Sequence, residues 1–343
     1  MAWGLRAWLD ACTGKHVRYS TAVARALKER GHEVLLTTRH HPDTLELARL
    51  LGEDFLAVGR YVPGSCEGKL RASIERERLL LGLLAEEGFE PDVAICHQSV
   101  ELCRVAFGLG VPVICTSDTP HAEAVGKLTI PLSDVLVASR AIPKSLFEGF
   151  GAHRIEQFDG VDEVAWISRP GLMAGEIPPE VAEATRPLIV VREEEHGASY
   201  MRGGGVMAKL AGELSELGSV IFLPRYGRPP SLPEDVITPS GFLDAALLAG
   251  EADLVVGAGG TLCREAALQG TPSIVVKLLG ARIHVNDYLA SKGFPIFEVE
   301  PGDVLKLAGE LLGRRWDTSS LLRSLEDPVP LIVRLAEELS REP

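Results

Sequence analysis

The chain has 343 residues, of which 46% are hydrophobic, which is enough for about two domains with substantial cores. Its formal net charge is −13 and it has no long run of Lys or Arg, which argues against a nucleic-acid partner. No segment approaches the roughly eighteen uninterrupted apolar residues of a membrane span, and Arg6 and Asp10 interrupt the N-terminus where a signal peptide would be apolar. We therefore expect a cytoplasmic protein. The six cysteines form no C-x-x-C pair and no Cys/His ligand pattern, so neither a disulfide nor a metal site is predicted.

Strand-like and helix-like segments alternate along the first half of the chain. Apolar runs predict strands at residues 5–9, 34–38, 93–96, 113–116 and 135–138. Segments with helical periodicity lie between them, at residues 17–30, 43–51, 69–87 and 100–107. Such alternation predicts a parallel sheet with helices on both faces.

The alternation breaks at residues 162–179, which are rich in Gly and Pro, and then resumes. Strands are predicted at residues 188–191, 220–223, 254–256, 273–276 and 296–299. Helices are predicted at residues 206–217, 241–248, 261–269, 284–291, 303–312 and 328–340. The expected organisation is a first domain over residues 1–165, a linker over 166–179, a second domain over 180–327 and a final helix over 328–343.

The stretch at residues 255–272, VVGAGGTLCREAALQGTP, is the most informative part of the chain. A buried strand runs into a turn with Gly257, Gly259 and Gly260, and a helix follows from about Thr261. Glycines permit positive φ and the close approach of a ligand, and a helix N-terminus favours an anion. Glu265, one helical turn further on, is suited to accept hydrogen bonds from sugar hydroxyls. The same pattern also fits an ordinary helix start, where an acidic side chain is favourable without any ligand.

Polar side chains follow the other predicted strands, where ligands of open α/β sheets bind. Histidines there are candidates for acid–base chemistry, and arginines are candidates for binding a diphosphate, although strand-end loops are generally polar. In the first half they are the stretch from Asp10 to His16, then Arg39, His40, His41, His97, Gln98, Ser99, Ser117, Asp118, Thr119 and His121. In the second half they are Arg192, Glu193, Glu194, Glu195, His196, Arg225, Tyr226, Lys277, Arg282 and His284.

Two rival motifs fail. A dinucleotide fingerprint would need a third glycine where Leu262 stands. Thr13-Gly14-Lys15 is similar to the end of a phosphate-binding P-loop, but His16 replaces the Ser or Thr that such a loop needs.

The sequence resembles the GT-B glycosyltransferase superfamily and, within it, an uncharacterised and largely archaeal family named for a domain of unknown function. The stretches that carry the resemblance are Arg30–Val34, Thr37–Arg39, Pro91–Ala94, His121–Ala124, Lys127–Pro131 and Gly257–Pro272. The resemblance implies an α/β GT-B fold: two Rossmann-like parallel-sheet domains that face each other across a cleft, with the C-terminal helix returning to the N-terminal domain.

Two better-understood relatives share parts of the pattern. The peptidoglycan lipid-intermediate N-acetylglucosaminyltransferase has a Thr-Gly-x-His-Val turn to which residues 13–17 are similar, which implies that His16 lies near the transferred sugar. That enzyme and UDP-N-acetylglucosamine 2-epimerase share a Glu-x4-Gly-x-Pro pattern, which Glu265, Gly270 and Pro272 match, so Glu265 is implied to hold the ribose. Against the epimerase, Ser99 stands where that family has a catalytic Asp, and its catalytic Glu falls near Ser117, beside Asp118.

These observations favour a metal-independent glycosyltransferase that uses a nucleotide sugar, most simply a UDP sugar, and no cofactor. The expected nucleotide-binding residues are Gly257, Gly259, Gly260, Thr261, Arg264, Glu265, Arg192 and Arg225. The candidates for the catalytic base are His16 and Asp118, followed by His97 and His121. The acceptor is not defined, and a contact with the membrane surface stays open. The alternatives are a UDP-N-acetylglucosamine 2-epimerase or hydrolase and a non-catalytic nucleotide-sugar binding protein.

Overall fold

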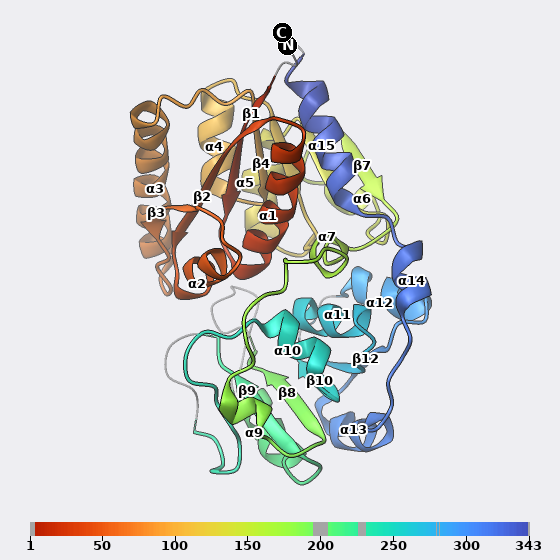
Figure 1. Cartoon of the computed structure of the whole chain (residues 1–343). Coiled ribbons are helices and arrows are strands. Elements are labelled where there is room, and N and C mark those ends of the chain that lie inside the picture. Colours follow the sequence, from red (N-terminus) through yellow and green to blue (C-terminus); the bar gives the residue numbers. More distant parts are fainter. Residues whose placement is uncertain (1–3, 195–204, 226–230, 279, 281, 342–343) are drawn as a thin grey trace. The chain divides into compact units, whose positions relative to one another are not determined.

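A computed structural model describes the chain except for residues 1–3, 195–204, 226–230, 279, 281 and 342–343 (Figure 1). Two compact units are present. The first consists of Met1–Leu172 together with Leu325–Pro343, and the second consists of Met173–Ser324. No helix in the described part of the chain is both long and apolar enough to span a membrane.

The first unit contains a seven-stranded parallel sheet with the order β3-β2-β1-β4-β5-β6-β7. The strands are β1 (Arg6–Ala11), β2 (Glu33–His40), β3 (Leu56–Arg60), β4 (Val93–His97), β5 (Val113–Thr116), β6 (Val135–Ser139) and β7 (Ile155–Phe158). The sequence predicted five of these strands and missed β3 and β7. Both are edge strands whose residues are mostly half-buried, so they lack the continuous apolar run that marks a central parallel strand.

Helices cover the faces of this sheet. They are α1 (Gly14–Glu29), α2 (Pro42–Leu50), α3 (Cys66–Glu86), α4 (Val100–Gly108), α5 (Glu123–Thr129), η1 (Ile130–Leu132), α6 (Ser145–Glu148), α7 (Val164–Ile167) and α15 (Pro328–Leu339). Thr13 caps α1, since its side chain accepts a hydrogen bond from the His16 N–H, and Ser99 caps α4 in the same way.

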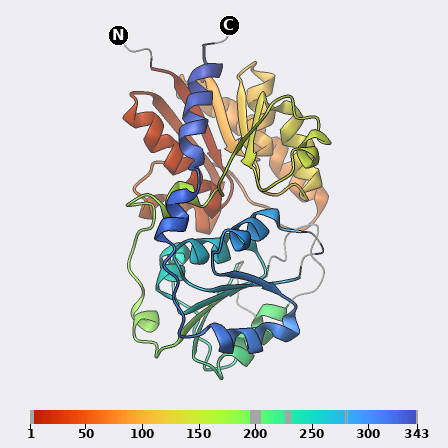
Figure 2. The same ribbon diagram turned by 90° about the vertical axis from the view of Figure 1, so that its right-hand side faces the viewer.

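The C-terminal helix α15 belongs to the first unit, where it packs against α1 (Figure 2). Asp327 caps its N-terminus, and Leu331 and Leu335 on its apolar face are buried. Burial of each such leucine stabilises the packed helix by about 1.5–3 kcal/mol. The prediction that the last helix returns to the N-terminal domain is therefore confirmed.

The second unit contains a five-stranded parallel sheet with the order β12-β11-β10-β8-β9. Its strands are β8 (Leu188–Arg192), β9 (Ser219–Leu223), β10 (Leu254–Gly257), β11 (Ser273–Val276) and β12 (Ile296–Val299). Its helices are α8 (Pro179–Ala182), α9 (Val206–Leu214), α10 (Ala245–Glu251), α11 (Gly260–Leu268), α12 (His284–Ser291), η2 (Pro301–Asp303), α13 (Val304–Leu311) and α14 (Ser319–Ser324). The predicted helix over 241–248 begins instead at Ala245, because the Asp244 carboxylate accepts from the N–H groups of Ala246 and Leu247.

Each sheet has one point at which the strand order reverses. In the first unit it lies between β1 and β4, and in the second it lies between β8 and β10. At such a switch point the connections leave toward opposite sides, which opens a crevice beyond the carboxyl ends of the two strands. These two places are where a ligand of each unit is expected.

Candidate functional site

The switch point of the first unit carries a cluster of ionisable side chains, here called the acid–base cluster: Lys15, His16, His97, Asp118 and Asp162. The Lys15 Nζ lies 2.6 Å from Asp118 Oδ2 and 2.8 Å from Asp162 Oδ2. The three side chains are only 11, 9 and 3% exposed, so little water screens these ion pairs. One lysine therefore holds two carboxylates from the loops after β5 and β7 at the end of β1.

His97 connects this group to β4 and β5. Its Nδ1 lies 2.6 Å from Thr116 Oγ1, and its Nε2 lies 3.2 Å from Asp118 Oδ1. With both ring nitrogens engaged and the side chain buried, His97 is placed to orient Asp118. The next residue, Gln98, has φ of 49°, and its Oε1 accepts hydrogen bonds from Ser117 Oγ and Thr119 Oγ1. A non-glycine residue in this left-handed region indicates a turn that the surroundings hold in place.

His16 faces His97, with 4.7 Å between the two ring centroids. Burial holds the pKa of His16 well below its usual value, and the charges of His97, Lys15 and Arg39 act in the same direction. His16 is therefore neutral near pH 7. Its Nδ1 accepts a hydrogen bond from the Cys12 N–H at 3.3 Å, which leaves the single ring proton on Nε2. In this arrangement the ring offers a donor rather than a lone pair at Nε2.

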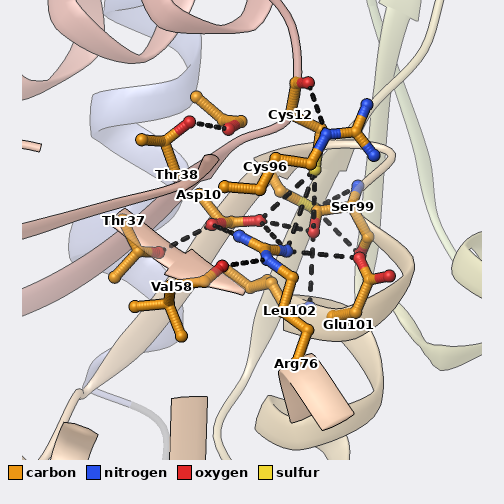
Figure 3. A network of polar contacts seen from close by, with 12 residues as sticks. Asp10, Cys12, Thr37, Thr38, Val58, Arg76, Cys96, Ser99, Glu101 and Leu102 are labelled. Atoms are coloured by element: carbon orange, nitrogen blue, oxygen red, sulfur yellow. Dashed lines mark hydrogen bonds and ion pairs between the residues drawn. The ribbon is translucent and has the colours of Figure 1, made fainter. Parts of the chain in front are cut away.

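Beneath the cluster lies a buried ion pair between β1 and α3 (Figure 3). The Arg76 guanidinium donates to both oxygens of Asp10, at 2.6 and 3.0 Å, and also to the Val58 carbonyl and to Glu101. Burial alone would raise the pKa of Asp10, but the charge and hydrogen bonds of Arg76, together with Ser99 and Thr37, bring it below its ordinary value.

This ion pair also reaches residues next to both histidines. The Ser99 hydroxyl donates to Asp10 at 2.6 Å, and the Cys12 Sγ lies 3.6 Å from the same carboxylate. Cys12 holds the His16 ring through its N–H, and Ser99 follows two residues after His97. The Asp10–Arg76 pair thus contacts residues that follow β1 and residues that follow β4, on both sides of the switch point.

Three of the four predicted base candidates, His16, His97 and Asp118, lie in the acid–base cluster. His121 lies at its margin, half-buried, where burial lowers its pKa and the charge of Asp118 opposes that effect. The sequence reasoning did not select Lys15 or Asp162. Lys15 was noted in the polar stretch from Asp10 to His16 and in a failed P-loop pattern but was given no role, and Asp162 was missed because the strand before it, β7, was missed.

Two groups of side chains in the described residues have the composition of metal ligands. His97, Asp118 and Asp162 offer ligand atoms within 4.8 Å of one another, and so do the buried thiols of Cys96, Cys103 and Cys115. The three thiols are not spaced as in a C-x-x-C motif, so the spacing pattern missed a group that the fold assembles, and all six cysteines are free. In the first group the Lys15 ammonium already contacts both carboxylates. The expectation of a metal-free mechanism stays a prediction.

The switch point of the second unit carries the glycine turn. β10 ends at Gly257, Gly259 precedes α11 with extended backbone, and among the described residues no side chain caps this helix. Gly257, Gly259 and Gly260 do not have positive φ, so the left-handed backbone that glycine permits is not used in this turn. They provide space: a Cβ would lie 3.0 Å from Arg225 Nη2 at Gly259 and 1.9 Å from Arg264 Nη1 at Gly260.

The guanidinium groups of Arg225 and Arg264 therefore lie against the glycine turn at the start of α11. The side-chain Nε of Arg225 donates to the Glu193 backbone carbonyl at 2.9 Å. The backbone N–H of Arg225 donates to the Glu193 carboxylate at 2.7 Å. Arg264 is buried and donates to Asn286 Oδ1 at 3.1 Å. Arg192, at the end of β8, donates to the Pro224 carbonyl at 3.0 Å. The guanidinium groups of Arg225 and Arg264 and the helix start without a side-chain cap are here called the electropositive seat, and Arg192 follows the neighbouring strand.

Glu265 lies in the first turns of α11 and is 5% exposed, and Thr261 is half-buried at the helix start. Gly270 ends the helix region with φ of 83°, where a Cβ would lie 2.1 Å from the Trp316 carbonyl oxygen. The neighbouring Glu194 has a local role, since its carboxylate accepts from the Val206 and Met207 N–H groups at the start of α9. Glu195, His196 and Tyr226, also noted in the sequence, lie outside the described residues.

Comparison with known proteins agrees with this architecture. A family model described as "Protein of unknown function (DUF354)" matches residues 5–340. A curated relative, "Uncharacterized protein MJ0665" of Methanocaldococcus jannaschii, is 31% identical over 96% of both chains.

Solved structures of glycosyltransferases and of an epimerase share the fold. The spinosyn forosaminyltransferase SpnP has a TM-score of 0.63 at 14% identity and is covered over 100% of its length by 99% of this chain. The spinosyn rhamnosyltransferase SpnG, in complex with thymidine diphosphate, has a TM-score of 0.62 at 16% identity, with 96% of this chain and 99% of that chain covered. The UDP-GlcNAc 2-epimerase of M. jannaschii, in complex with UDP-GlcNAc and UDP, has a TM-score of 0.70 at 15% identity, with 97% and 100% covered. The predicted GT-B fold is confirmed.

Proposed function

Since this chain belongs to the DUF354 family of unknown function, we propose from its own residues that it is a nucleotide-sugar-dependent glycosyltransferase of the metal-independent GT-B type. The observation that carries the proposal is the electropositive seat at the start of α11, at the switch point of the second unit. The acid–base cluster at the corresponding switch point of the first unit supports it. An anion seat and a set of proton-transfer groups are the two things that such a transfer needs.

The donor, most simply a UDP sugar, binds with its diphosphate at Gly257, Gly259, Gly260 and Thr261. Backbone N–H groups at the helix start and the guanidinium groups of Arg225, Arg264 and Arg192 stabilise the negative charge of the leaving nucleoside diphosphate. Glu265 accepts hydrogen bonds from the ribose hydroxyls at its small exposed edge.

Asp118 is the base that we favour. Its carboxylate is held by Lys15 and His97, whereas His16 presents an N–H at Nε2 as long as Cys12 donates to Nδ1. Asp118 removes the proton of an acceptor hydroxyl, whose oxygen forms a bond to the anomeric carbon of the sugar. The bond from that carbon to the diphosphate oxygen breaks, and the electron pair leaves with the diphosphate. His16 donates a hydrogen bond to the transferred sugar, and His97 and His121 support Asp118.

Lys15 provides positive charge where a divalent cation would otherwise be expected. The ammonium neutralises one of the two carboxylates and keeps both oriented, so a metal ion is not needed to assemble the cluster. Incubation with EDTA is therefore expected to leave the transfer rate unchanged, and a Mg²⁺ requirement would contradict this part of the proposal.

The first experiment is a calorimetric and thermal-shift screen of UDP, GDP, ADP, CDP and dTDP. A nucleotide at a hundred times its Kd should stabilise the protein by about 2.7 kcal/mol. Glu265→Ala and Arg225→Gln should each lose this effect, whereas Lys209→Gln, on the exposed face of α9, should keep it. If no nucleotide binds the wild-type protein, the glycine turn is only a helix start and the proposed function is wrong.

A UDP-N-acetylglucosamine 2-epimerase or hydrolase is the second candidate. It is favoured by the two carboxylates of the acid–base cluster, because Asp118 and Asp162 could supply the proton transfers for which the sequence comparison found serines. Incubation with UDP-N-acetylglucosamine alone separates the candidates, since an epimerase or hydrolase consumes it without an acceptor. Tight binding without turnover under all acceptors tested would instead indicate a non-catalytic nucleotide-sugar binding protein.

A further inference from the structure

The edge of the first sheet next to the acid–base cluster carries two arginines and an aromatic ring, here called the cationic edge: Arg39, Arg60 and Tyr61. Arg39 and Arg60 lie at the carboxyl ends of β2 and β3, the same edge of the parallel sheet at which β1 and β4 deliver His16 and His97. The Arg39 Nε donates to the Cys12 carbonyl at 3.0 Å, and Cys12 in turn holds the His16 ring. The cationic edge is therefore continuous with the acid–base cluster.

A β-bulge shapes this edge. The register between β2 and β3 shifts between Thr38 and His40, where one residue of β2, Arg39, faces two residues of β3, Val58 and Gly59. The extra residue is Gly59, with φ of 68°, and a Cβ there would lie 2.9 Å from Arg76 Cγ. The Val58 carbonyl accepts from Arg76 Nε at 2.9 Å (Figure 3). Bulges commonly re-aim side chains beside functional sites, and here the bulge brings Arg60 opposite His40.

Arg39 contacts a backbone carbonyl and an aromatic ring rather than a carboxylate. Its guanidinium carbon lies 4.6 Å from the centroid of the Tyr61 ring, but within the described residues neither Arg39 nor Arg60 pairs with a carboxylate. Arg76, on the other side of Cys12, pairs with both Asp10 and Glu101. Within the part of the chain that the structure describes, two neighbouring guanidinium groups, one of them half-buried, therefore lack a carboxylate partner, although the chain has a net charge of −13.

We propose that the cationic edge binds an oxyanion, a phosphate or carboxylate group, of the molecule that accepts the sugar. One carbonyl and one aromatic face fix Arg39, so its planar fork of N–H groups is already oriented and loses little freedom on binding an oxyanion. Arg60 adds a second positive charge. An anion bound here places the rest of the acceptor toward Asp118. This assignment of acceptor class rests on the proposed transferase function, but the anion site itself can be measured without turnover.

Inorganic phosphate is the probe, and the histidine resonances of the full chain in NMR are the readout. The centroids of the His41 and Tyr61 rings are 5.5 Å apart, so His41 reports on the cationic edge. His284 lies in the second unit and serves as the comparison. Phosphate should shift the His41 resonance, and chloride at equal ionic strength should not. A response of His284 alone would locate phosphate on the second unit and overturn the proposal. If nucleotides fail to bind but His41 still responds, the proposed function fails and the anion site remains.

Three variants test the residues. Arg39→Gln should weaken phosphate binding about tenfold or more, as the loss of a charged hydrogen-bond donor implies. Arg39→Lys keeps the positive charge but not the planar fork of N–H groups. Its affinity for phosphate should lie between those of the wild-type protein and Arg39→Gln. Arg78→Gln, which removes an exposed arginine of α3 that pairs with Glu75, should leave binding unchanged. Unchanged binding in Arg39→Gln, with unchanged melting temperature, would overturn the proposal.

Flotation with vesicles identifies the source of the phosphate. Flotation with phosphatidylcholine vesicles that contain phosphatidic acid, but not with phosphatidylcholine alone, and its loss in Arg39→Gln, would support a lipid-borne phosphate. Arg39-dependent binding of free phosphate without flotation would support a water-soluble acceptor.

Discussion

Removal of the Asp10 charge should cost the first unit a large part of its stability. Asp10→Asn keeps the shape of the side chain, but the Arg76 guanidinium, only 2% exposed, then loses its bidentate partner at 2.6 and 3.0 Å. Breaking a buried ion pair from one side costs about 3–5 kcal/mol. Glu101 remains 3.2 Å from Arg76 and is 15% exposed, so it compensates in part. We therefore expect Asp10→Asn to lower the free energy of unfolding by about 3 kcal/mol, the lower end of that range.

The assay is urea unfolding combined with hydrogen exchange of the β1 and α3 amides, because two units need not unfold together. Asp10→Asn combined with Arg76→Met should cost less than the sum of the two single changes, since the double variant buries no unpaired charge. Glu75→Gln, at an exposed ion pair on the same helix, is the control and should change nothing measurable.

The pH dependence gives an independent check. The folded pKa of Asp10 is lowered, so its contribution is fully present above the unfolded pKa of about 3.9. It is lost as the pH falls from there through the folded pKa. The difference between the wild-type protein and Asp10→Asn should therefore be constant near neutrality and shrink in acid. A loss below about 1 kcal/mol at pH 7, or strictly additive single changes, would refute the reasoning.

Three further predictions concern the acid–base cluster and the end of α11. The pKa of His16 is lowered in the folded protein, so the unfolded chain binds a proton at this residue more readily. The stability should therefore fall as the pH drops below about 6.5, and in melting curves His16→Gln should lack this part of the pH dependence. Lys15→Met leaves two facing carboxylates and should reduce the transfer rate by about 10²-fold or more, measured at saturating donor, whereas an unchanged rate would contradict a role for the ammonium. Gly270→Ala places a side chain at positive φ and against the Trp316 carbonyl, and it should lower the free energy of unfolding by about 2 kcal/mol or more. Gly309→Ala, at an open helical position of α13, is the control and should be neutral or stabilising in thermal unfolding.

Local patterns were enough to predict most of the fold. Buried parallel strands and amphipathic helices repeat their apolar residues with fixed periods, so the central strands of both sheets and the start of α11 could be read along the chain. Resemblance added the GT-B architecture and the return of the last helix. The edge strands β3 and β7 were missed because their solvent-facing residues dilute the apolar signal.

The sites depend on contacts that no local pattern contains. Lys15 meets Asp162 although 147 positions separate them, and Asp10 meets Arg76 across 66. The turn at Gly257–Gly260 was recognised, but only the packed structure reveals that its glycines make room for the guanidinium groups of Arg225 and Arg264. The sequence by itself determined most of the strands and helices and their order, because burial of apolar faces is periodic. Tertiary structure alone decided which charges face one another, because strand order, not chain order, brings the carboxyl ends of β1, β4, β5 and β7 to one edge.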